Sequence, residues 1–255
     1  MAKGCFLIVN ADDFGYDESR TNAILAAWRG GIVTHATVMV TMPDCSRAVA
    51  LAKQAGFDKA LGLHVNLTEG CPLTDNIKRH MSFCDENGFF NHAFLRTPLK
   101  RFLLTSQERK AVSEEVEAQF QRFMDCGLTP GHVDSHHHVH FNYSIASVVV
   151  PIARKYGFKT IRIGYNLYVP SRLVRVYREL MNIYYRKRLG TRSRYFAGYN
   201  PVIDLSTLSA ATEIMVHPRY MKDGIECSGG ELFDYDTKMD EVVAWLSKWQ
   251  GKGVA

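Results

Sequence analysis

The stretch Cys5-Phe-Leu-Ile-Val-Asn-Ala-Asp-Asp-Phe-Gly15 decides the fold class, because a short apolar run ends abruptly in a polar turn. The run is continuous rather than alternating, which is typical of a strand buried on both faces of a parallel sheet. The pattern then becomes helical from about Asp17 to Trp28 and stops at Gly30-Gly31. A strand, a polar turn and a helix in this order form one βα unit.

The same unit recurs along the chain. We expect further strands at residues 32–40, 61–67, 132–135, 160–163 and 212–216, and helices at 45–54, 106–124, 145–156, 172–189 and 238–249. The helix at 106–124 is amphipathic, and we expect Glu114, Glu115 and Glu117 on its solvated face. Residues 69–104 and 190–211 are irregular and are expected to form long loops. This alternation predicts an α/β fold, and 255 residues suit a single barrel domain spanning 1–255.

Composition excludes several classes of protein. With 46% hydrophobic and 22% charged residues, the chain is neither intrinsically disordered nor a small disulfide scaffold. The N-terminus lacks the apolar run of about 7–15 residues that a secretory signal needs, and no stretch approaches the roughly 20 of a membrane span. We therefore expect a cytoplasmic protein. Its six cysteines form no C-x-x-C pair and are expected to be reduced thiols: Cys5, Cys45, Cys71, Cys84, Cys126 and Cys227.

Polar residues follow the predicted strands, where α/β barrels carry their chemistry. Of two adjacent carboxylates, Asp12 and Asp13, one can ligate a metal while the other accepts a proton. The alternative is an ordinary helix N-cap turn. His64 lies within an apolar strand, where it is either a ligand or a hydrogen-bonded core residue. His217 precedes Pro218 and is either a general acid or a turn residue.

Five of the ten histidines lie in Gly131-His-Val-Asp-Ser-His-His-His-Val-His140. His132, Asp134 and His136 share one face if the strand continues that far. A solvated loop has no need of five imidazoles, which favours a metal or catalytic role. One aspartate and two histidines would form a mixed nitrogen and oxygen site with open positions for water and substrate. That set predicts metal-assisted hydrolysis of an amide or ester.

These residues resemble the YdjC-like family of ChbG/HpnK-type carbohydrate deacetylases. The resemblance lies in Ile8-Val-Asn-Ala-Asp-Asp-Phe-Gly15, Gly30-Gly-Ile-Val-Thr34, Leu61-Gly-Leu-His-Val-Asn-Leu-Thr68, His132-Val-Asp-Ser-His-His-His-Val-His140 and Met215-Val-His-Pro218. It implies a distorted, TIM-barrel-like (β/α) barrel related to polysaccharide deacetylases. It also implies removal of an N-acetyl group from an amino sugar in an oligosaccharide or glycolipid.

The resemblance assigns roles to particular residues. Asp13, His64 and His136 match the family's metal ligands, Asp12 matches the catalytic base, and His217 matches the acid that protonates the departing amine. The implied metal is Mg²⁺, and two imidazoles make Zn²⁺ chemically reasonable as well. The remaining histidines of the block would support the ligands or contact substrate: His137, His138 and His140. Two alternatives stay open, a glycoside hydrolase that uses paired carboxylates and a non-enzymatic basic binding protein.

Residues 172–194 carry eight basic side chains and one acid, so a formal +7 lies in this segment while the whole chain has +5. Apolar residues recur between the charges at helical spacing. The segment is either a surface helix whose apolar stripe enters the core, or a basic amphipathic helix that meets an anionic glycan or a membrane surface carrying a glycolipid. Nucleic acid is not expected, because no recognised binding motif accompanies the charge. The sequence leaves a homo-oligomer open.

Overall fold

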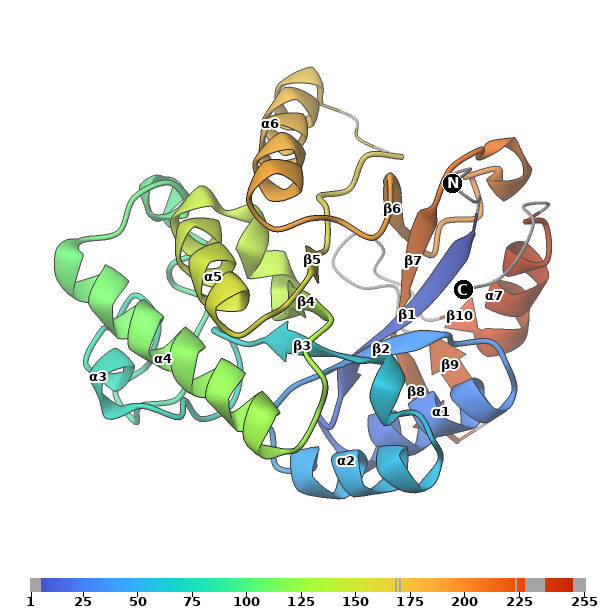
Figure 1. Ribbon diagram of the computed structural model, residues 1–255, viewed down its shortest axis with the longest axis horizontal. Coiled ribbons are helices and arrows are strands. Elements are labelled where there is room, and N and C mark those ends of the chain that lie inside the picture. The colour runs from blue at the N-terminus through green and yellow to red at the C-terminus, as the bar shows by residue number, and fades with distance from the viewer. Residues whose placement is uncertain (1–5, 168, 170, 223, 228–236, 250–255) are drawn as a thin grey trace.

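The computed structural model describes residues 6–167, 169, 171–222, 224–227 and 237–249 (Figure 1). The expectation for Cys5, and the outermost residues of the expected 1–255 domain, lie outside these ranges. Among the described helices, none is both long and apolar enough to cross a membrane.

One sheet of seven parallel strands organises the molecule. Its order is β5-β4-β3-β2-β1-β7-β6, so the first strand of the chain lies inside the sheet between β2 and β7. The strands are β1 (Leu7–Phe14), β2 (His35–Val38), β3 (Leu61–Val65), β4 (His132–Ser135), β5 (Thr160–Ile161), β6 (Tyr195–Gly198) and β7 (Thr212–Val216). Because all are parallel, their carboxyl ends meet at one edge of the sheet, where ligand sites of α/β proteins form.

Helices cover the outer face of this curved sheet, as Figure 1 shows. The helices of the described residues are α1 (Glu18–Arg29), α2 (Cys45–Gln54), α3 (Asp75–Lys78), α4 (Ser106–Asp125), α5 (Tyr143–Lys155), α6 (Arg172–Arg188) and α7 (Met239–Leu246). Short 3₁₀ turns are η1 (Asp58–Ala60), η2 (Pro98–Arg101), η3 (His136–Phe141) and η4 (Leu205–Thr207). Helix α4 begins with a capping box in which Thr105 and Glu108 each satisfy the other's backbone N–H.

The two faces of the sheet differ in polarity. In β1, Leu7, Val9 and Ala11 pack in the main apolar core, while the alternate residues Asn10 and Asp12 are buried among polar groups on the other face. This alternation is the ordinary consequence of a pleated strand. It places an apolar layer under the helices and a charged layer inside the curve of the sheet.

The sheet is an open half-barrel, with β5 and β6 as its outer strands. The expected α/β fold is confirmed, whereas a TIM barrel would close into a ring of eight strands. The gap between the outer strands β5 and β6 is bridged by Asn166, which follows β5 in the chain. Its side chain donates to the Arg194 carbonyl at 2.8 Å and accepts from Phe196 N–H at 3.0 Å.

The remaining differences from expectation concern short or local elements. Strand β6 lies within residues 190–211, which were expected to be loop. An antiparallel sheet of β8 (Pro218–Met221), β9 (Gly224–Cys227) and β10 (Thr237–Lys238) follows β7 and was not expected.

The expectation for Glu115 was wrong, because it is fully buried. Its carboxylate accepts hydrogen bonds from Leu73 N–H at 3.1 Å and Thr74 N–H at 2.8 Å. The loop at 71–74 crosses this face of α4, and its backbone donors need an acceptor there.

Candidate metal centre and active site

At the end of β1, the side chains of Asp12 and Asp13 point in different directions. The pairing of β1 with β2 shifts between Ala11 and Phe14, so β1 carries one more residue than its partner there. Asp13 has φ of 65°, a left-handed conformation that few residues other than glycine, asparagine and aspartate adopt. Such strain persists where the surroundings impose it, commonly at functional sites. As a result Asp12 points into the interior of the half-barrel, while Asp13 faces the histidines.

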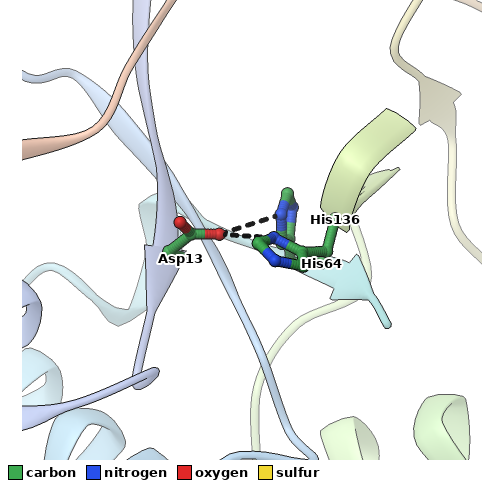
Figure 2. A group of neighbouring side chains, drawn as sticks. All are labelled: Asp13, His64 and His136. Carbon is green, nitrogen blue, oxygen red and sulfur yellow. Dashed lines mark ion pairs between the residues drawn. The ribbon is translucent and has the colours of Figure 1, made fainter. Parts of the chain in front are cut away.

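Asp13, His64 and His136 come together in space, as Figure 2 shows. Asp13 Oδ1 lies 3.3 Å from His64 Nε2 and 2.9 Å from His136 Nδ1. Asp13 and His64 lie near the carboxyl ends of β1 and β3, and His136 begins η3 directly after β4. The structure therefore brings together the three residues that the sequence nominated as metal ligands.

His64 is held in one orientation from behind. Its Nδ1 donates to Asp134 Oδ1 at 2.6 Å, and Thr37 Oγ1 donates to the other oxygen of that carboxylate at 3.1 Å. This leaves Nε2 as the nitrogen that faces Asp13. Metal-bound histidines are typically oriented in this way, by a carboxylate on the opposite ring nitrogen.

The histidine block turns sharply after β4. His137 and His138 have φ of 48° and 51°, so two consecutive residues adopt left-handed conformations. His137 then lies beside Thr68, with 3.0 Å between Nδ1 and Oγ1, and His138 Nε2 lies 2.7 Å from the Tyr165 hydroxyl. His140 turns away and is fully buried, in contact with Ser135 and the Arg162 carbonyl. Of the three, only His137 and His138 line the pocket described below.

The polar atoms of this cluster fit a cation. Among the described residues, Asp13 Oδ1, His64 Nε2 and His136 Nε2 are buried and have no hydrogen-bond partner. Ligand atoms about 2.1 Å from a metal lie about 3.0–3.4 Å from one another. The 3.3 Å between Asp13 Oδ1 and His64 Nε2 lies within this range, and the 2.9 Å between Asp13 Oδ1 and His136 Nδ1 is slightly below it (Figure 2).

Formal charge also favours a divalent ion. The inner face of the sheet carries four buried carboxylates and two guanidiniums: Asp12, Asp13, Asp134, Glu213, Arg162 and Arg192. Four negative charges against two positive charges leave −2. Since uncompensated buried charge is costly, either protonated histidines or a divalent cation must balance it.

Arg162 lies at the centre of this charged layer and was not nominated by the sequence. It is completely buried and binds Asp12 through two hydrogen bonds of 2.5 and 2.7 Å. It also contacts Asp134 and Glu213 at 2.7 Å each. Residues 160–163 were expected to form a strand. In the sequence, Arg162 cannot be told apart from an arginine on the surface, so its contacts with the buried carboxylates could not be predicted.

The pKa values follow from this arrangement. Burial alone would raise the pKa of Asp12, but the Arg162 guanidinium outweighs it and holds this pKa far below its usual range. Burial alone would lower the pKa of His64 and His136. Nearby carboxylates, chiefly Asp134 for His64 and Asp13 for His136, instead raise these pKa values to about 10 and about 9. A general acid in a glycosidase needs a carboxyl pKa that is raised, so lowered values at Asp12 and Asp13 argue against that alternative.

The cluster opens into a pocket of about 320 Å³, within the range of small-molecule sites. Asp12, His217 and Met215 line it together with the three proposed ligands. His217 follows β7, and its backbone N–H donates to Cys227 Sγ at 3.3 Å, which ties it to β9. The candidate base and acid therefore share one pocket with the candidate metal site.

Glu69 was also missed by the sequence analysis. Its Oε1 lies 3.5 Å from His136 Nε2 and 3.7 Å from His137 Nε2, and Tyr16 donates to its other oxygen at 2.6 Å. Glu69 follows directly on the quoted motif that ends at Thr68, so its place just after a strand end was the signal available. Glu69 and Tyr16 also line a second, larger pocket of about 660 Å³, next to His92 and Arg96.

Other clusters of possible ligands are weaker candidates. His132, Asp134 and Glu213 approach one another, but Arg162 already neutralises both carboxylates. Glu69, His92 and His137 also lie close enough to share an ion, although all three are partly exposed to solvent. In the group of Asp13, His64 and His136, Arg20 Nε lies 3.9 Å from Asp13 Oδ2, while Asp13 Oδ1 faces the two histidines.

Comparisons with known proteins agree with this site. The family model described as "YdjC-like protein" matches residues 6–248. A protein named carbohydrate deacetylase from Geobacillus stearothermophilus is 35% identical over 220 residues, covering 85% of this chain and 80% of that protein. Another protein of the same name, from Vibrio cholerae, is 32% identical over 225 residues, covering 88% and 82%.

A solved structure shares the fold. It comes from Enterococcus faecalis V583 and is described as a cellobiose-phosphate cleavage protein. It superposes with a TM-score of 0.67 at 27% sequence identity, over 86% of this chain and 83% of that one. The quoted sequence motifs lie within the matched residues 6–248, and the chain belongs to the YdjC-like family.

Proposed function

We propose that this protein is a metal-dependent carbohydrate N-deacetylase, which hydrolyses the acetamide of an N-acetylated amino sugar. The observation that carries the proposal is the pocket in which Asp13, His64 and His136 each bring one ligand atom within 4.8 Å of the others, beside an ionised Asp12. The names of the relatives from Geobacillus and Vibrio support carbohydrate deacetylation.

Asp13, His64 and His136 would hold the metal. When bound there, a divalent ion polarises the acetyl carbonyl and lowers the pKa of water. Mg²⁺ is the proposed ion from the family resemblance, and the two imidazoles make Zn²⁺ the second candidate. Asp134 would keep His64 in its ligating orientation.

Asp12 is the proposed base, and His217 the proposed acid. Arg162 keeps Asp12 ionised and fixed by two hydrogen bonds, so its carboxylate can accept a proton from the attacking water without first losing one. His217 lines the same pocket and would give a proton to the departing sugar amine. The tetrahedral carbon formed by the attack then collapses to acetate and the free amine.

The larger pocket gives the proposal a place for the rest of the substrate. It shares Tyr16 and Glu69 with the smaller pocket, so a sugar attached to the reacting residue can extend past them toward His92 and Arg96. This arrangement supports an oligosaccharide or a glycolipid headgroup rather than a single free sugar.

We also propose that the chain acts as one domain in the cytoplasm. Strand β1 pairs with β7 along its length, which joins the beginning of the chain to its later part. The described cysteines are free thiols, as is usual in a reducing compartment: Cys45, Cys71, Cys84, Cys126 and Cys227.

Acetate release tests the proposal. Protein loaded with Mg²⁺ or Zn²⁺ is incubated with N-acetylated oligosaccharides and glycolipids, and acetate is measured. Asp13→Asn is expected to lower kcat/KM at least about a hundredfold, as when a group that stabilises the transition state is removed. Asp75→Asn makes the same chemical change at an exposed aspartate and is expected to remain fully active. Full activity of Asp13→Asn, or of protein stripped of metal, would refute the mechanism.

A further inference from the structure

Helix α6 turns an apolar stripe away from the rest of the protein. Its buried side is formed by Met181, Asn182 and Tyr185. The stripe on the opposite side has the spacing i, i+3, i+7, i+10 and consists of Leu173, Val176, Leu180 and Ile183. Leu173 is 82% and Leu180 61% exposed, so this stripe does not enter the core. In Figure 1 the helix stands at the upper edge of the molecule, away from α1 and α2.

A second exposed apolar segment adjoins the helix. It lies around η2, where Leu99 is 67% and Leu103 65% exposed. Phe102 contacts Tyr177 of α6 with 5.6 Å between ring centroids, which joins the two segments into one surface. Nine of the fourteen exposed large apolar side chains in the described residues lie on this surface: Leu99, Phe102, Leu103, Tyr143, Leu173, Val174, Val176, Leu180 and Ile183. Such a concentration marks an interaction surface rather than scattered exposure.

Positive charge surrounds the stripe. Helix α6 carries six basic side chains: Arg172, Arg175, Arg178, Arg186, Lys187 and Arg188. Its single acid, Glu179, is already paired with Arg186 at 2.5 Å. Arg101 adds a further cation beside Phe102.

We propose that α6 and residues 99–103, together the α6 surface, dock on an anionic membrane. An amphipathic helix with basic residues flanking an apolar stripe lies in the headgroup region, its apolar face among the acyl chains and its cations on the phosphates. A second copy of this chain fits less well. A symmetric pair of α6 helices would bring two strongly basic helices together with no free acid between them.

The α6 surface is connected to the pocket by a short chain of contacts. Arg178 donates to the Tyr165 carbonyl at 3.4 Å, and the Tyr165 hydroxyl lies 2.7 Å from His138, which lines the pocket. Docking through α6 would therefore bring the pocket close to the membrane. This inference concerns binding alone and stands independently of the proposed reaction.

Vesicle binding tests the docking. The protein is incubated with vesicles of phosphatidylcholine alone and of equal parts phosphatidylcholine and phosphatidylglycerol, and bound protein is measured by sedimentation. We expect binding only to the anionic vesicles, weakened by added salt. Leu173→Ser with Leu180→Ser, and separately Arg172→Gln with Lys187→Gln, are each expected to weaken binding by about tenfold or more.

A matched control removes the same charge elsewhere. Arg29→Gln with Lys59→Gln takes two exposed cations from the α1 and η1 region, and it is expected to bind like the unchanged protein. Circular dichroism checks that every variant is folded. Docking is refuted if anionic vesicles bind no protein, or if both α6 variants bind normally. It is also refuted if light scattering shows a dimer that Leu173→Ser with Leu180→Ser dissociates, because a second copy then covers the α6 surface.

Discussion

The two faces of the central sheet are built from alternate residues of the same strands, yet they differ in almost every physical respect. In β3, Leu61, Leu63 and Val65 pack under the helices, while His64 between them faces the charged interior. In β7, Ile214 and Val216 lie in the apolar core, and Glu213 faces Arg162. The outer face should tolerate substitution by other apolar side chains, since side chains of similar volume would bury a similar area.

The inner face has no such tolerance. Every carboxylate there loses its water on burial and needs a specific partner at a specific distance. Arg162 supplies that partner for Asp12, Asp134 and Glu213. The comparison teaches that the apolar outer face mainly stabilises the fold. The inner face holds charged groups in place for chemistry, and their burial lowers the stability of the fold.

Removing the central cation should give the largest effect. Arg162→Met keeps much of the side-chain volume but leaves three buried carboxylates without it. We expect a loss of about 3–5 kcal/mol in the free energy of unfolding, the usual cost of breaking a buried ion pair. Urea denaturation measures it, and acetate release is expected to fall as well because Asp12 loses its support. A variant that kept both stability and activity would show that the inner face tolerates substitution after all.

Truncating an apolar side chain on the outer face should lower the stability of the fold without changing catalysis. Leu63→Ala removes a fully buried side chain next to His64 in sequence. We expect about 2–4 kcal/mol of destabilisation from lost burial and the remaining cavity. At temperatures where the variant is folded, kcat should change less than about twofold. A loss of kcat as large as that of Arg162→Met would remove the distinction between the faces.

A milder substitution on the inner face should lower the affinity for the metal. Asp134→Asn is nearly isosteric and keeps an acceptor near His64, but removes the charge that orients its ring. We expect metal affinity to fall about 10–100-fold, as for other carboxylates behind a ligating histidine. Isothermal titration calorimetry measures the affinity. Glu114→Gln, at an exposed position of α4, is the control, and equal affinity of both variants would contradict the role given to Asp134.

Metal affinity should also depend on pH. In the metal-free protein the pKa of His64 is raised to about 10 and that of His136 to about 9, so both carry protons at neutral pH. A metal must displace these protons, and affinity should rise by up to about tenfold per pH unit for each until pH passes 9.

Calorimetry in buffers of different ionisation heat counts the protons released. The raised pKa values also stabilise the metal-free fold below pH about 6.5, and this contribution is lost as pH rises toward 9–10. His137→Gln is the control for the slope, because burial lowers the pKa of His137 to about 4. An affinity that does not change with pH would contradict the charge balance described for the inner face.

Much of this was predictable from local sequence pattern. Short apolar runs that end in polar residues identified β1, β3 and β7, and β4 was expected at residues 132–135. Parallel strands place such ends side by side. The grouping of Asp13, His64 and His136 follows from that rule and from the family resemblance. Arg162 and Glu69 were missed because their importance depends on partners far along the chain, at Asp12 and His136.

Other errors have similar causes. Glu115 was assigned to solvent because helical periodicity does not show which loop will cross a helix. Strands β6, β8, β9 and β10 are short, and their pairing is decided by neighbours rather than by their own composition. The stripe on α6 could be identified from sequence as apolar, but only the structure shows that it faces outward.

The position of β1 inside the sheet has a consequence for synthesis of the protein. Its pairing with β2 involves residues about 25 positions away, whereas its pairing with β7 joins Leu7 to Thr212. As the chain leaves the ribosome from its N-terminus, one edge of β1 must wait for residues made much later. Asp12 is made about 150 residues before Arg162 and about 200 residues before His217. The pocket therefore cannot assemble until residue 217 has been made, long after the aspartates of β1.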